Sequence, residues 1–102
     1  MLFHAKHRPR IAAGEVTVSF RLWKRPHVRA DKTYATGFGD IAVDEVDLLP
    51  AALISDEDAR LAGCRDAAEV WQLAGGHTKT DVQPDTMLYR VQFRFLGKDR
   101  SP

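Results

Sequence analysis

Two things are scarce in this sequence: cysteine and long hydrophobic runs. The one cysteine, Cys64, cannot form a disulfide within the chain, which is typical of proteins from a reducing compartment. No apolar stretch approaches the roughly 18 residues that a membrane-spanning helix needs. The residues after Met1 also lack the apolar core of a secretory signal peptide. We therefore expect a cytoplasmic protein with no membrane partner.

Motifs for metal binding, phosphate binding and nucleophilic catalysis are missing as well. His4 and His7 are close in sequence, but no Cys-x-x-Cys or His-Glu-x-x-His spacing occurs. Gly37 and Gly39 predict a turn rather than a phosphate-binding loop. Cys64, next to Gly63, is expected to be a small buried residue rather than a reactive thiol. We therefore expect no metal, no cofactor and no assignable catalytic residue.

The composition is that of a globular protein, with 44% hydrophobic and 28% charged residues among 102. A chain of this length has room for one domain with one modest core, so we expect residues 1–102 to form a single domain. The sequence does not indicate the oligomeric state.

Charge is unevenly distributed along the chain. Residues 1–32 contain eight Lys and Arg against two Asp and Glu, whereas the remainder contains seven against twelve. Folding such a chain produces a positive face. That face is either an ordinary solvated surface or a binding site for phosphate groups.

Alternation of polar and apolar residues predicts two main strands, at residues 15–22 and 87–95. Between them the alternation changes parity at Asp44-Glu45, which predicts a β-bulge. A shorter strand is expected over residues 33–36. Seven apolar residues of the two main strands are expected to line one common core: Val16, Val18, Phe20, Met87, Tyr89, Val91 and Phe93.

Helical signals occur in two places. Pro9 and Gly14 suit the first turn and the C-terminal end of a short helix. Ser55 is a candidate N-cap for a helix with an acidic first turn, which should end at Gly63. A further helix is expected to begin at Asp66, which forms a capping-box variant with Glu69 three positions on. Gly75-Gly76 should end this helix. Residues 76–85 predict a loop.

This order of elements predicts a mixed α+β fold that is mainly β. Because only one substantial helical block interrupts the strands, a parallel βαβ sheet does not fit. We expect a small β-barrel of about five or six strands, with about two or three short helices packed against it.

The basic part of the chain also carries the candidate binding residues. Ser19 and Arg21 leave their strand on the side opposite the apolar residues, and a guanidinium offers a fork of donors suited to phosphate or a base edge. The following segment, 23–29, interleaves cations with an indole, as proteins that hold single-stranded nucleic acid do. The alternative is an exposed strand face with solvated cations and a tryptophan that caps the barrel. The candidate ligand-binding residues are Ser19, Arg21, Trp23, Lys24, Arg25 and Arg29.

Residues 11–21 resemble the signature of the ASCH family. That family carries a glycine, a lysine two residues on, an acidic or hydroxyl residue three further, and an arginine two beyond. Gly14, Ser19 and Arg21 match three of these positions, and Val16 stands at the lysine position. Residues 54–63 resemble the family's acidic helix start, and residues 88–93 its closing strand. The resemblance implies a small stand-alone ASCH protein whose PUA-like barrel has a cleft between the barrel and its helices.

The resemblance also implies functions. Members of the family are proposed to bind RNA, some act as amidohydrolases on acetylcytidine, and a ribonuclease activity has been attributed to others. The amidohydrolases use a lysine, a threonine and a glutamate. Ser19 would stand in for the threonine, but Val16 replaces the lysine, and the stretch around Ala62 offers no glutamate. The expected function is therefore binding of RNA or a modified nucleotide in a basic cleft. The alternatives are a hydrolase of a modified nucleoside or RNA, and a protein-interaction module that uses its acidic helical side.

Overall fold

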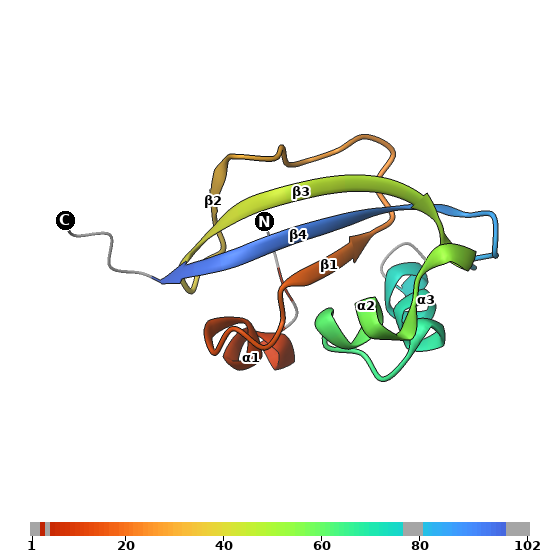
Figure 1. The fold of residues 1–102 in the computed structure, drawn as a ribbon, viewed down its shortest axis with the longest axis horizontal. Coiled ribbons are helices and arrows are strands. Elements are labelled where there is room, and N and C mark those ends of the chain that lie inside the picture. The colour runs from red at the N-terminus through yellow and green to blue at the C-terminus, as the bar shows by residue number, and fades with distance from the viewer. Residues whose placement is uncertain (1–2, 4, 77–80, 98–102) are drawn as a thin grey trace.

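Figure 1 shows the computed structural model of the protein, which describes residue 3, residues 5–76 and residues 81–97. Along the chain its elements are the 3-10 helix η1 (Ala5–His7), α1 (Arg8–Ala12), β1 (Val18–Arg21), β2 (Thr33–Ala35), β3 (Asp40–Pro50), the 3-10 helix η2 (Ala51–Leu53), α2 (Asp56–Leu61), α3 (Ala67–Gly76) and β4 (Met87–Gly97). The mixed α+β class predicted from the sequence is confirmed. No helix in the described ranges is long and apolar enough to cross a bilayer.

The sheet is antiparallel, with the strand order β1-β4-β3-β2. The described residues contribute four strands, fewer than the five or six expected, and the outer strands β1 and β2 do not pair with each other. Within these residues the sheet is therefore open rather than closed into the predicted barrel. The long strands β3 and β4 form a twisted ribbon to which β1 adds on one side (Figure 1).

The predicted bulge lies where the sequence placed it. Val43 pairs with Phe93 and Glu45 with Gln92, so that Asp44 is an extra residue in β3. A second irregularity, between Asp40 and Ile41, was not predicted.

Val43, next to the bulge, also makes two backbone hydrogen bonds to the residues that precede β2. The Asp31 N–H donates to the Val43 carbonyl, and the Val43 N–H donates to the Lys32 carbonyl, both at 2.8 Å. These bonds anchor one end of the segment 22–32. In Figure 1 this segment passes above β3 and β4, on the other side from the helices.

The register between β1 and β4 decides which residues share a face of the sheet. Ser19 lies opposite Val91, and opposite residues of an antiparallel pair point to the same side. The side chains of Val18 and Phe20 therefore point to one face, whereas Val91 and Phe93 point to the other. Each strand alternates as predicted, but the expectation that both sets line one face is wrong.

Both faces are covered, so the protein has two apolar clusters instead of one common core. The first lies between the sheet and the helices α2 and α3, and its buried residues are Val18, Phe20, Ala51, Ile54, Ala59, Cys64, Val70, Ala74 and Leu88. The second lies on the other face, and its buried residues are Ile11, Val16, Val28, Ile41, Val43, Val91 and Phe93. Val28 belongs to the segment 22–32, which is thereby packed onto this face.

Neighbouring elements cover the two faces of the sheet along different parts of β4. This difference explains why Met87 and Tyr89 are not buried as predicted. Leu88 points toward the helices and is fully buried. Its neighbour Met87, expected in the core, points to the opposite face and is 44% exposed. Tyr89 shares that second face and is half-buried. Coverage by neighbouring elements, rather than alternation alone, therefore sets burial at this end of β4.

The predicted helix starts are confirmed by hydrogen bonds. The Ser55 Oγ accepts from the Asp58 N–H at 3.0 Å at the start of α2. The Asp66 carboxylate accepts from the Glu69 N–H at 3.0 Å at the start of α3, and the Glu69 carboxylate accepts from the Arg65 N–H at 3.2 Å.

The predicted helix ends are also found. Gly14 and Gly63 follow α1 and α2 with φ of 79° and 84°, the left-handed region that favours glycine. Of the loop expected over residues 76–85, residues 77–80 lie outside the described residues, and residues 81–85 form neither helix nor strand.

A bidentate ion pair between Arg90 and Asp58 fixes α2 to the sheet. The Arg90 guanidinium of β4 donates to both oxygens of the Asp58 carboxylate, at 3.1 and 3.0 Å. The Arg90 side chain is only 15% exposed, so the pair is partly shielded from water. The first turn of α2 is thereby held against β4.

The observed register predicts unequal effects of two neighbouring substitutions. Leu88→Ala should lower the free energy of unfolding by about 2–5 kcal/mol because it leaves a cavity in the first cluster. Met87→Ala should change it by about 0.5 kcal/mol or less because Met87 is largely exposed. Urea unfolding followed by circular dichroism measures both values. A larger loss of stability for Met87→Ala than for Leu88→Ala would contradict the faces of the sheet to which these residues are assigned.

Candidate ligand-binding site

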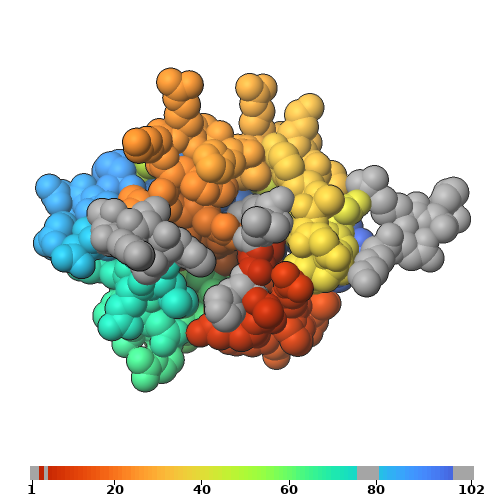
Figure 2. All heavy atoms as spheres, turned by 180° about the vertical axis from the view of Figure 1, so that it is seen from behind, coloured from red at the N-terminus to blue at the C-terminus, as the bar shows by residue number. Residues whose placement is uncertain are grey.

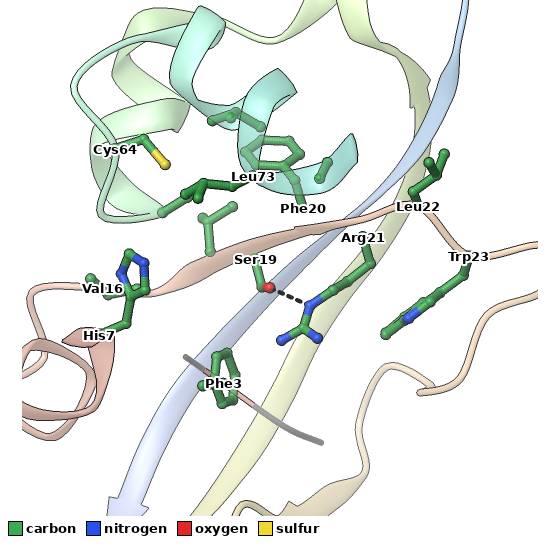
Figure 3. Close-up of a pocket in the computed structure, with 14 residues that line it drawn as sticks. Phe3, His7, Val16, Ser19, Phe20, Arg21, Leu22, Trp23, Cys64 and Leu73 are labelled. Atoms are coloured by element: carbon green, nitrogen blue, oxygen red, sulfur yellow. Dashed lines mark hydrogen bonds between the residues drawn. The ribbon is translucent and has the colours of Figure 1, made fainter. Parts of the chain in front are cut away.

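A cavity of about 430 Å³ runs along β1, at the edge of the sheet (Figure 3). Its lining comes from the N-terminal segment, from β1 and the residues that flank it, and from the α2–α3 region: Phe3, His7, Val16, Val18, Ser19, Phe20, Arg21, Leu22, Trp23, Ala62, Cys64, Val70, Leu73 and Ala74. Pockets that bind small molecules are roughly 300–1,000 Å³ in volume. The cavity is therefore large enough for a small organic ligand.

Arg21 is the main polar group of the pocket. Its Nε donates to the Ser19 Oγ at 2.7 Å. Its guanidinium lies between two aromatic rings, 5.1 Å from the ring centre of Phe3 and 5.8 Å from that of Trp23 (Figure 3). Burial lowers the pKa of Arg21, but a guanidinium remains charged at neutral pH. The pocket thus presents a fixed cation among aromatic side chains.

The geometry around Arg21 follows from its place in the sheet. Ser19 and Arg21 are two residues apart in β1, so they share the face of the second cluster. Trp23 comes just after the strand and packs against that cluster. It stacks on His27 at 4.5 Å between ring centres, and its ring centre is 6.0 Å from that of Tyr89.

The structure brings together three of the six candidate residues. Ser19, Arg21 and Trp23 line the pocket. Lys24, Arg25 and Arg29 do not: their side chains are exposed and belong to the segment 22–32. In Figure 2, which views the molecule from behind, this segment (orange) covers the upper part of the surface, above α1 (red) and α3 (teal).

The cations therefore lie on a surface beside the pocket rather than inside it. Among the described residues that line the pocket, Arg21 is the only Lys or Arg, and none is Asp or Glu. Sequence patterns did not indicate Phe3 or His7, because neither belongs to a periodic element. The wall from α3 was predicted as a helix between residue 66 and Gly75-Gly76, but these signals do not show which strand the helix faces.

Cys64 lines the pocket as a neutral thiol. Burial, with a smaller contribution from the Glu69 carboxylate, raises its pKa to about 11. Since the thiolate is the nucleophilic form, Cys64 is a poor nucleophile at neutral pH. The expected small buried residue between helices is confirmed.

Gly63, which precedes it, is needed because a Cβ there would come within 2.6 Å of the His7 Nδ1. Among the described residues no group of three or more His, Cys, Asp and Glu side chains could hold a metal ion. His4 and His77 lie outside those residues.

Two solved structures have folds similar to that of this chain. One is the crystal structure of a protein from Enterococcus faecalis V583 assigned to the DUF984 family model, with a TM-score of 0.65 and 12% identity over 95% of this chain and 74% of that chain. The other is the ASCH domain from Lactobacillus crispatus JV V101, with a TM-score of 0.66 and 15% identity over 87% of this chain and 69% of that chain. By sequence, the chain matches no family model and no curated protein.

The fold is therefore that of a small mixed α+β domain with an antiparallel sheet. The four strands and three short α-helices of the described residues have the ASCH-like fold. The resemblance first drawn from Gly14, Ser19 and Arg21 is confirmed at the level of the fold.

The raised pKa of Cys64 predicts a pH dependence of stability. The pKa is about 11 in the folded protein against an ordinary value of 9.0, so the unfolded chain loses its thiol proton first. The stabilising contribution is full below pH 9.0 and is lost as pH rises toward 11. Urea unfolding at about pH 8 and about pH 10.5 should show a larger loss in the wild type than in Cys64→Ala. Equal losses in the two proteins would contradict the shift.

Proposed function

We propose that this protein binds RNA or a modified nucleotide, with a base or nucleoside in the pocket beside β1 and phosphates at the exposed cations of the segment 22–32. The observation that carries the proposal is the guanidinium of Arg21, held between the rings of Phe3 and Trp23 and bonded to Ser19 in the pocket wall. A guanidinium and a hydroxyl in fixed positions suit the polar edge of a base or a phosphate.

The apolar walls support the same ligand class. Bases have large flat faces that stack on aromatic or guanidinium planes and pack on aliphatic side chains. The pocket offers both kinds of surface, from Phe3 and Arg21 on one side of β1 and from Leu73 and Ala74 of α3 on the other. Its volume suits one nucleoside better than a stretch of chain.

The remainder of a longer RNA would then meet the surface next to the pocket. Lys24 and Arg25 follow Trp23 directly, Arg29 lies four residues after Arg25, and all three are exposed to solvent. Exposed cations hold a phosphate chain without reading its sequence, whereas groups in a pocket can discriminate among bases. The proposal therefore divides affinity and selectivity between the surface and the pocket.

Binding without hydrolysis fits this pocket better than an amidohydrolase does. The residue at the family's lysine position is Val16, which is buried and apolar. In the described part of the pocket lining there is no carboxylate to act as a general acid or base, and the Cys64 thiol is neutral.

The acidic helical side gives little support to the protein-interaction alternative. Asp58 is paired with Arg90, and the Asp66 and Glu69 carboxylates accept hydrogen bonds at the start of α3. These acids have structural roles.

The proposal predicts a salt-dependent affinity for RNA. About three engaged cations should give a slope of log affinity against log salt of roughly −2, since each neutralised phosphate contributes about −0.7 on a single strand. Lys24→Ala or Arg25→Ala should flatten the slope by somewhat less than about one unit. Fluorescence anisotropy with a short labelled single-stranded RNA at several KCl concentrations measures it.

The matched control is Arg60→Ala, which removes an exposed cation of α2 that does not line the pocket. This variant should leave the slope unchanged. A flat salt response of the wild type would show that the cations of the segment 22–32 are only a solvated surface.

The proposal also predicts little or no hydrolysis of acetylcytidine. Val16 cannot supply a charge or a proton, and Val16→Lys alone should not create activity because the acid partner is still missing. Release of acetate, measured chromatographically with purified protein, tests this. Turnover that disappears in Ser19→Ala would favour the hydrolase alternative over a binding protein.

A further inference from the structure

All four residues of β1, Val18 to Arg21, line the pocket. In an antiparallel pair, the residues whose N–H and C=O groups face the partner strand alternate with residues whose groups face away. The Phe93 N–H donates to the Thr17 carbonyl at 2.9 Å. This bond shows which residues of β1 direct their backbone groups to β4 and which direct them away. Ser19 and Arg21 therefore direct their backbone groups to β4, whereas Val18 and Phe20 direct theirs to the outer edge.

That outer edge has no strand beside it in the described part of the chain, where β1 pairs with β4 alone. Val18 and Phe20 both line the cavity, so a ligand in it would lie next to this outer edge. Backbone N–H and C=O groups at the edge of a sheet can serve as a donor and an acceptor for such a ligand.

The edge is too short and too closed for strand addition by a peptide. Upstream, the Thr17 N–H already donates to the Leu61 carbonyl at the end of α2, at 2.9 Å. Downstream, β1 ends at Arg21. Between these limits only Val18 and Phe20 offer outward groups, so an extended peptide would gain few backbone bonds. A compact planar ligand matches this length better.

We infer that the outward N–H and C=O of Val18 and Phe20 recognise the hydrogen-bonding edge of a nucleobase. This inference rests on the proposed function and specifies how the base is held. A base lying in the plane of the sheet, where the next strand would run, meets these groups with its edge. Its two faces would then contact α3 on one side and Phe3 with Arg21 on the other (Figure 3).

Backbone recognition of this kind selects bases whose edge carries a neighbouring donor and acceptor. The Watson–Crick edge of every common base has such a pair, and methylation of its ring nitrogen blocks it. The site should therefore bind an unmodified nucleotide and reject the same nucleotide methylated at that nitrogen. Discrimination of this kind arises because the outward backbone groups would be left unpaired.

Amide hydrogen exchange followed by NMR tests the inference on the intact protein. The four ribonucleoside 5′-monophosphates are added separately, and the one that binds most tightly is compared with its analogue methylated at the Watson–Crick nitrogen. Saturation with the unmodified nucleotide should slow exchange of the Val18 and Phe20 amides by about tenfold or more. The amides of Thr17 and Ser19, already bonded within the protein, are the internal controls and should change little.

The outcomes separate the inference from the proposed function. A nucleotide that binds less tightly to Arg21→Lys, but leaves exchange at Val18 and Phe20 unchanged, would overturn the inference and keep the function. An analogue methylated at the edge that binds as well as its parent would do the same. Absence of binding by all four nucleotides, together with absence of binding by the short single-stranded RNA, would overturn both. Protection of the two amides by the peptide Thr-Val-Thr-Val alone would assign the edge to strand addition instead.

Discussion

The arrangement of the site depends on one constraint: β1 is an outer strand that is covered on both faces and hydrogen-bonded on one side only. Its register against β4, with Ser19 opposite Val91, sends Ser19 and Arg21 to one face and Val18 and Phe20 to the other. A slip of one residue would exchange these sets and place a guanidinium among the apolar residues under α3. The apolar packing of Phe20 thus fixes the position of Arg21 as well as contributing stability.

The aromatic surroundings of Arg21 depend on a second constraint, the bulge in β3. Val43 lies next to the extra residue and opposite Phe93, and its own N–H and C=O bond to residues 31 and 32 rather than to β4. Val28 packs into the second cluster, so the segment 22–32 is held within its length as well as at the end that leads into β2. Trp23 leaves β1 at the start of this segment and reaches Arg21. A backbone irregularity far from the pocket therefore shapes one of its walls.

Local patterns predicted the elements well because local physics determines them. The caps at Ser55 and Asp66, the helix end at Gly63 and the parity change at Asp44 each depend on neighbours in sequence. The relative register of β1 and β4 does not, because alternation within one strand says nothing about which residue of another strand lies opposite. The pocket depends on that register and on contacts of Phe3, so only the Ser19–Trp23 part of it could be anticipated.

The protein carries two kinds of cation, which differ in their exposure to solvent. Arg21 is held by a hydroxyl and two aromatic rings, contacts that orient its guanidinium without cancelling its charge. Lys24 and Arg25 are exposed, where salt screens them and long side chains adapt to a phosphate chain. A partly dehydrated, fixed cation acts over a short range and selects geometry, whereas solvated cations act over a longer range and attract any polyanion. In the proposed complex the two groups would contact different parts of the ligand, so substitutions in one should alter selectivity and substitutions in the other affinity, with little coupling between them.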